Sequence, residues 1–165
     1  MRIRKIFYLL FISLLPCLVI SCDDDDDDNS YSEWRLKNEA AIDSIKNVPG
    51  YQVATVPEGP GNVYYKVLKE GTGTESPIYT SQVSLKYKGS LIDETVFDDR
   101  SKVNTSFYVY GVVPGMTVAL QNMKVGDKWE VWIPWQLGYG TSSTTSIPSY
   151  SALIFELELV SILKY

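Results

Sequence analysis

Apolar and polar residues alternate along four segments of the chain, all of them after residue 62. A period of two is typical of β-strands that bury one face, because successive side chains of a strand point to opposite sides. The pattern predicts four or five strands that share one apolar face. The residues on that face are Val63, Tyr65, Val67, Val83, Leu85, Tyr87, Leu91, Trp129, Val131, Ile133, Leu153, Phe155, Leu157 and Leu159.

A single short helix is expected to cover this face. It follows Pro114-Gly115 and ends before Gly126. A sheet with one apolar face needs such a covering layer. The sequence therefore predicts an α+β fold, in which an antiparallel sheet wraps one short helix. The apolar positions that recur at helical spacing are Met116, Ala119, Leu120 and Met123.

A second helix is predicted before the sheet, within residues 31–62. Residues 30–33 fit a capping box with Ser30 as the N-cap, and the helix is expected to stop before Pro49. Residues 49–62 then form a turn-rich connection. The apolar stripe of this helix is narrow, which leaves two interpretations open. The helix docks Trp34 and Ile45 on the domain of a monomer, which we prefer, or residues 31–47 form a dimerisation arm.

Residues 1–21 are typical of an export signal. Basic residues precede an apolar run from Ile6 to Ile20, which is shorter than the ~20 residues that span a bilayer. The following Ser21-Cys22 resembles the lipobox of bacterial lipoproteins, in which the cysteine is lipidated. The alternative is an ordinary signal peptide with an incidental cysteine. We expect a lipid anchor at Cys22 in the cell envelope, at the outer membrane, facing either the surface or the periplasm.

Six consecutive aspartates follow this cysteine, from Asp23 to Asp28. Like charges repel one another, so residues 22–30 are expected to form a solvated acidic tether. A calcium loop is the alternative, but the run lacks the alternating ligand spacing and the turn glycine of such loops. An acidic run after a lipidated cysteine also resembles the surface-export signal of Bacteroidetes lipoproteins.

Composition excludes several kinds of chemistry. The chain has no histidine, so imidazole catalysis is excluded. Its two cysteines, Cys17 and Cys22, precede the domain, so the domain has no disulfide and no cysteine-based metal site. Beyond residue 28 the chain carries 12 basic and 14 acidic residues. This near-neutral balance argues against a nucleic-acid partner, and we expect no metal or organic cofactor.

Seven short motifs follow one another in residues 63–165. They are Leu85–Gly89, Val96–Asp99, Ser106-Phe107, Gly111–Met116, Met123–Lys128, Leu137–Gly140 and Ile147-Pro148. In this order and spacing they resemble the FKBP-type peptidyl-prolyl isomerases. The resemblance implies that the sheet is curved around the short helix. It also implies cis–trans isomerisation of the peptide bond before proline, in exported polypeptides, with chaperone behaviour and macrolide ligands as further expectations.

The resemblance also implies the residues of the site. Asp98 would orient Tyr87 or the ligand, and the Tyr139 hydroxyl would bind a substrate carbonyl. The residues expected to act in catalysis are Tyr87, Phe97, Asp98 and Tyr139. The residues expected to line the proline pocket are Phe107, Val112, Val113, Met116, Ile147 and Phe155.

Three positions depart from the family pattern. Met116 stands where tryptophan is usual, Thr105 where a second aromatic is common, and Glu94 where glycine is frequent. We expect the Glu94 change to be harmless. The other two raise the alternative of a non-catalytic binding module with the same fold. A third hypothesis is a carbohydrate-binding surface lipoprotein that uses Trp132 and Trp135.

Overall fold

A computed structural model describes residues 26–165. The predicted export signal, Cys22 and the start of the acidic tether lie outside the described residues. The helices are α1 (Asp26–Ile45) and α2 (Pro114–Asn122), with short 3-10 helices η1 (Val109–Gly111) and η2 (Trp135–Leu137). The strands are β1 (Gln52–Ala54), β2 (Val63–Lys69), β3 (Gln82–Ser90), β4 (Val96–Asp99), β5 (Thr105–Tyr108), β6 (Lys128–Ile133) and β7 (Leu153–Lys164).

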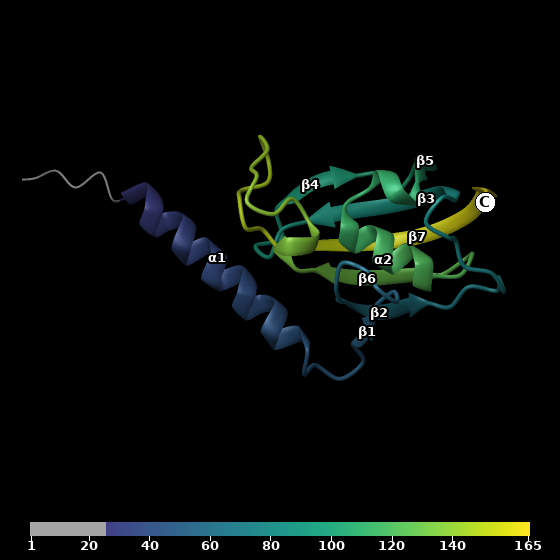
Figure 1. Cartoon of the computed structure of the whole chain (residues 1–165), viewed down its shortest axis with the longest axis horizontal. Coiled ribbons are helices and arrows are strands. Elements are labelled where there is room, and N and C mark those ends of the chain that lie inside the picture. The colour runs from purple at the N-terminus through teal and green to yellow at the C-terminus, as the bar shows by residue number, and fades with distance from the viewer. Residues whose placement is uncertain (1–25) are drawn as a thin grey trace, which may run out of the picture.

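The strands form one antiparallel sheet in the order β1-β2-β6-β7-β3-β4, and β5 also pairs with β3. The sheet curves around α2, as Figure 1 shows, so the predicted α+β architecture is confirmed. The first turn of α2 lies so close to the sheet that a Cβ on Gly115 would overlap the Ile133 side chain. A glycine at this position therefore lets the helix seat against β6.

The alternation seen in the sequence matches the burial of the long strands. In β6 the side chains of Trp129, Val131 and Ile133 are buried, and the residues between them are partly exposed. The same pattern runs along β7 from Leu153 to Leu159. Together with α2 these residues form the hydrophobic core, which holds the sheet in a fixed curvature.

The sheet begins earlier than predicted. Residues 49–62 were expected to be a connection only, yet β1 lies within them and pairs Gln52 with Tyr65 and Ala54 with Val63. A three-residue strand is too short to show a period of two, so its pairing with β2 could not be seen in the sequence.

Helix α1 also begins earlier than predicted, at Asp26. The capping-box prediction is therefore wrong, because Ser30 lies inside the helix, and the expected tether is helical from Asp26 onward. The helix ends at Ile45, before Pro49 as expected, and it buries Ile42 and Ile45 against the domain. Within residues 26–165, no helix is long and apolar enough to cross a bilayer.

Candidate active site

A hollow of about 370 Å³ opens between the N-terminal end of α2, strands β3 to β5 and the segment after η2. We call it the pocket. It brings together every residue that the sequence assigned to the site except Ile147. The residues that line it are Tyr87, Phe97, Asp98, Phe107, Gly111, Val112, Val113, Met116, Tyr139 and Phe155.

Aromatic rings form the walls of the pocket. The ring centroid of Tyr87 lies 5.9 Å from that of Phe107 and 6.2 Å from that of Phe155. Phe97 meets Phe155 edge to face at 5.6 Å. Such tilted contacts are the favoured arrangement of aromatic pairs, so the rings hold one another in place. The result is a preformed surface of aromatic rings inside the pocket.

The close approach of two of these rings depends on Gly89 in β3. Its register partners are Asp98 on β4 and Phe155 on β7. A Cβ at Gly89 would lie 2.5 Å from the Phe97 ring and 2.8 Å from the Phe155 ring, well inside contact distance. Gly89 was not predicted as a site residue. The sequence did contain one signal, a glycine inside a predicted strand. Such a glycine often marks a position where another group approaches the backbone closely.

The polar edge of the pocket is formed by Tyr87 and Asp98, which are hydrogen-bonded to each other. The Tyr87 hydroxyl donates a 2.6 Å hydrogen bond to Asp98 Oδ2, and Arg100 Nε donates to Oδ1 at 3.3 Å. Burial, and then the hydrogen bond to the Asp98 carboxylate, raise the pKa of Tyr87 to about 12. Tyr87 therefore remains a neutral donor throughout the physiological range, and Asp98 fixes its orientation.

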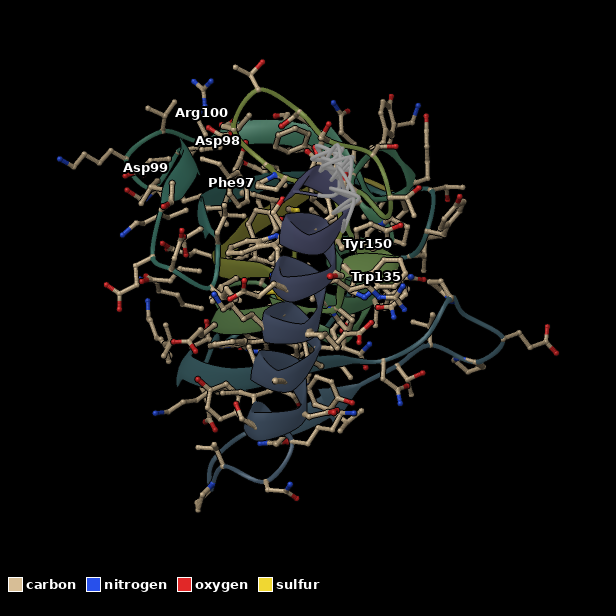
Figure 2. All side chains as sticks on the ribbon, turned by 90° about the vertical axis from the view of Figure 1, so that its left-hand side faces the viewer. Phe97, Asp98, Asp99, Arg100, Trp135 and Tyr150 are labelled. Atoms are coloured by element: carbon tan, nitrogen blue, oxygen red, sulfur yellow. The ribbon has the colours of Figure 1, made fainter. Side chains whose placement is uncertain are left out.

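The neighbouring aspartate has a different environment. Asp99 is exposed and accepts a 2.9 Å hydrogen bond from the Ser101 backbone N–H, and the side-chain hydrogen bond of Ser101 is the first cause that lowers its pKa. Asp99 thus caps a surface turn, while Asp98 lines the pocket. Figure 2 shows Phe97, Asp98, Asp99 and Arg100 on the opposite side of α1 from Trp135 and Tyr150.

Tyr139 and Met116 complete the pocket from two sides. Tyr139 is 43% exposed, and its hydroxyl makes no hydrogen bond to any residue between 26 and 165, so it is free to bind a ligand. Met116 is buried at the start of α2, where it supplies the apolar floor. A methionine floor is flexible because three side-chain torsions can rotate.

Ile147 is not part of the pocket, which corrects the expectation that it caps one side. It is 4% exposed and belongs to the hydrophobic core. Its N–H donates to Thr144 Oγ1 at 3.1 Å, and its carbonyl accepts from the Thr144 N–H at 2.8 Å. These two bonds make a tight turn that fixes the backbone while the side chain packs inward.

Glu94 is also not the harmless change that was expected. It lies in the turn between β3 and β4 with a φ of 67°, in the left-handed region. Side chains with a Cβ are disfavoured there, and glycine is not. The turn that presents Phe97 and Asp98 is therefore strained at this residue.

The tryptophans proposed for carbohydrate binding are engaged within the protein. Trp132 Nε1 donates to Glu130 at 2.7 Å, and Trp135 Nε1 donates to Glu39 at 3.1 Å. The Arg35 guanidinium lies 5.3 Å from the centroid of the Trp135 ring. A sugar platform needs an open ring face, so these contacts favour a packing role.

The sequence profile of the family described as FKBP-type peptidyl-prolyl cis-trans isomerase matches residues 73–160. The chain belongs to this family. Every pocket residue found above lies inside the matched range, and the strands β3 to β7 with α2 form the matched part of the fold.

Curated members of the FKBP-type family are similar over much of the chain. Outer membrane protein MIP of Legionella longbeachae is 38% identical over 80% of this chain and 55% of its own length. The FKBP-type 22 kDa peptidyl-prolyl cis-trans isomerase of Escherichia coli is 44% identical over 60% of this chain and 49% of its own. The chain thus spans about half the length of these relatives.

Solved structures agree with the fold. The crystal structure of FkpA from Escherichia coli superposes with a TM-score of 0.72 at 32% identity, over 83% of this chain and 62% of FkpA. A peptidyl-prolyl cis-trans isomerase from Pseudomonas syringae pv. tomato gives a TM-score of 0.71 at 30% identity, over 79% of this chain and 94% of that chain.

Proposed function

We propose that this protein is a peptidyl-prolyl cis-trans isomerase that acts on proline-containing polypeptides of the cell envelope. The observation that carries the proposal is the pocket itself. It joins an apolar aromatic surface to the Tyr87–Asp98 hydrogen bond and to the free hydroxyl of Tyr139. Membership of the family supports the same reaction. By the same resemblance, macrolides would compete for the pocket.

The reaction needs no covalent step. Rotation about the bond before proline breaks amide resonance, and its barrier is ~18–20 kcal/mol. An apolar pocket favours the twisted amide, which is less polar than the planar form. In our proposal the prolyl ring lies between Phe97, Phe155 and Met116. The Tyr139 hydroxyl and the Val113 backbone N–H donate to substrate carbonyls, which fixes the chain on either side of the rotating bond.

Isomerase activity on a short Xaa-Pro peptide tests the proposal. We expect the wild-type protein to accelerate exchange, measured by a protease-coupled assay or by NMR exchange. Phe97→Ala and Asp98→Ala are expected to reduce the rate most, because they remove a wall and the group that orients Tyr87. Tyr139→Phe is expected to have a smaller effect. A folded wild-type protein without any acceleration would eliminate the enzymatic function.

A non-catalytic binding module is the second candidate, and Met116 is the observation that favours it. A flexible floor can accept a prolyl segment without holding it in the geometry of the twisted bond. This function predicts saturable binding of a proline-containing peptide, seen by calorimetry, together with no rate increase in the isomerase assay. Peptide binding together with faster cis–trans exchange would support the enzymatic function instead.

For location, we propose that a lipid on Cys22 anchors the protein to the outer membrane. The support is the signal-like segment 1–21, the Ser21-Cys22 pair and a relative that is itself named an outer membrane protein. Metabolic labelling with a fatty acid should mark the wild type and not Cys22→Ser. Protease treatment of intact cells should then distinguish a surface position, which the aspartate run favours, from a periplasmic one. Fatty-acid label that persists in Cys22→Ser would show that Cys22 is not the lipidated residue.

A further inference from the structure

Helix α1 contacts the C-terminal end of the loop that carries Tyr139 and also the 3-10 helix η2 that precedes this loop. This loop, residues 138–152, leaves η2 and returns to β7, and we call it the pocket loop. At its C-terminal end, Trp34 Nε1 donates to Ser151 Oγ at 2.9 Å, and Asn38 Oδ1 accepts the Ala152 N–H at 2.8 Å. Just before its N-terminal end, Trp135 Nε1 donates to Glu39 on the same helix.

Asn38 is the centre of this contact. Its side chain is fully buried, and both ends of the amide are used, since Nδ2 donates to the Trp34 carbonyl at 2.8 Å. A buried amide with both partners in place has one orientation. Asn38 therefore fixes Ala152, which is itself fully buried, relative to the axis of α1.

Two backbone hydrogen bonds tie the C-terminal part of the pocket loop to Gly140, the residue after Tyr139. Two residues before Ala152, the Tyr150 N–H donates to the Gly140 carbonyl at 2.9 Å. The Gly140 N–H in turn donates to the Trp135 carbonyl at 3.0 Å. Tyr139 is held next to Gly140, so the two ends of the pocket loop determine where its hydroxyl lies over the pocket.

The backbone at Tyr150 adds a reason why the loop needs an external support. Tyr150 has a φ of 60°, in the left-handed region that a bulky residue avoids. Its ring is held by Arg35 of α1, at 5.3 Å from the centroid, and by the edge-to-face ring of Trp135 at 5.1 Å. A strained conformation persists only when its surroundings determine it, and here α1 supplies part of those surroundings.

We propose that Asn38 is a positioning residue for the prolyl pocket, which acts through Ala152 and the pocket loop on the hydroxyl of Tyr139. In this arrangement α1 is part of the binding site although none of its residues lines the pocket. The inference rests on the proposed function, because it concerns how the Tyr139 hydroxyl meets a substrate carbonyl.

A double-mutant cycle on the full chain in detergent tests the inference. Asn38→Ala is expected to lower kcat/KM for an Xaa-Pro peptide by about tenfold, because a displaced contact group loses its alignment. In the Tyr139→Phe background the same change should cost less than about twofold, since sites that act as a unit are not additive. Equal losses in both backgrounds, with folded protein, would show a general structural role and overturn the inference.

Two further variants serve as a control on the same helix and as a substitute if Asn38→Ala does not fold. Lys37→Ala, whose side chain is exposed and pairs with Glu33 on the same helix, should leave kcat/KM unchanged. Should Asn38→Ala not fold, Trp34→Phe replaces it in the cycle, because it removes the hydrogen bond to Ser151 and keeps an aromatic ring against the core. It should show the same non-additivity with a smaller loss, and additivity would overturn the inference.

Amide hydrogen exchange separates this inference from the proposed function. Asn38→Ala should speed exchange at Gly140, Tyr150 and Ala152 and leave the amides of β3 and α2 unchanged. This readout needs no catalysis, so it still decides whether Asn38 positions the pocket loop if the isomerase assay is negative. Unchanged exchange at Gly140 and Tyr150 would overturn the coupling, whatever the activity.

Discussion

The Tyr87 hydroxyl on β3 donates a 2.6 Å hydrogen bond to Asp98 Oδ2 on β4. Burial first, and the Asp98 carboxylate second, raise the pKa of Tyr87 from 10.0 to about 12. A group whose pKa is higher in the folded chain stabilises the fold fully below its unfolded pKa. The contribution of Tyr87 is therefore complete below pH 10 and disappears as the pH rises through about 12.

The first prediction concerns this pair. Asp98→Asn should lower the pKa of Tyr87, because the negative charge that opposes tyrosinate is gone. The pKa should stay above 10.0, because burial is the larger cause and is unchanged. Alkaline absorbance titrations of Asp98→Asn with and without Tyr87→Phe isolate the single tyrosine. A midpoint that stays at about 12 in Asp98→Asn would mean that the carboxylate has no part in the shift.

The second prediction concerns Gly89. Gly89→Ala places a methyl group where the rings of Phe97 and Phe155 now lie, so at least one ring must move out of the pocket wall. We expect kcat/KM to fall by about tenfold or more, and stability to fall by about 1–3 kcal/mol from overpacking. Urea unfolding and the peptide assay measure the two effects. Ser90→Ala, the next residue of β3 and outside the pocket, is the control and should change neither quantity. Wild-type activity in Gly89→Ala would refute the packing argument.

The third prediction concerns the turn at Glu94. Glu94→Gly should raise the free energy of unfolding by about 1 kcal/mol, because it relieves the left-handed backbone at φ 67°. Glu94→Ala is the matched control. It keeps a Cβ and so should bring no gain, although it removes the same carboxylate. Equal stabilisation by both variants, measured by urea unfolding, would assign the effect to charge and not to backbone strain.

The fourth prediction concerns the floor of the pocket. Met116→Trp replaces a flexible side chain with a rigid ring, so the bound prolyl segment should lose less alignment during rotation. We expect kcat/KM to rise by about fivefold, or about 1 kcal/mol of barrier. Met123→Leu, a buried change at the other end of α2, should leave the rate unaltered. A folded Met116→Trp with an unchanged or lower rate would show that the floor does not limit catalysis.

The sequence was sufficient for the long elements and for most of the pocket. Buried residues such as Leu85 and Val131 belong to a period-two pattern, because one face of the sheet packs on α2. This pattern of apolar positions can be seen directly in the sequence. The site residues came from motif resemblance. That resemblance placed Phe97 and Asp98 correctly although β4 is too short to be predicted as a strand.

What the sequence did not give depends on tertiary contacts. Ile147 was assigned to the pocket by its motif, but the turn at Thr144 and the core decide which way it points. Asn38 is a polar residue on a narrow apolar stripe, so nothing marked it as buried before its partner Ala152 was known. The start of α1 was missed because a run of aspartates is typical of a solvated segment, and the pattern does not show where the helix begins.

If Cys22 carries the proposed lipid, the length of α1 limits how far the domain can lie from the membrane. Trp34 of this helix is bonded to the pocket loop, and Figure 1 shows the N-terminal end of α1 projecting away from the sheet. The turns from Asp26 to Glu33 add about 1.5 Å per residue as a stiff rod. The four steps from Cys22 to Asp26 add at most about 3.6 Å each. With the proposed lipid at Cys22, this reach would keep the pocket within a thin layer of solution next to the bilayer.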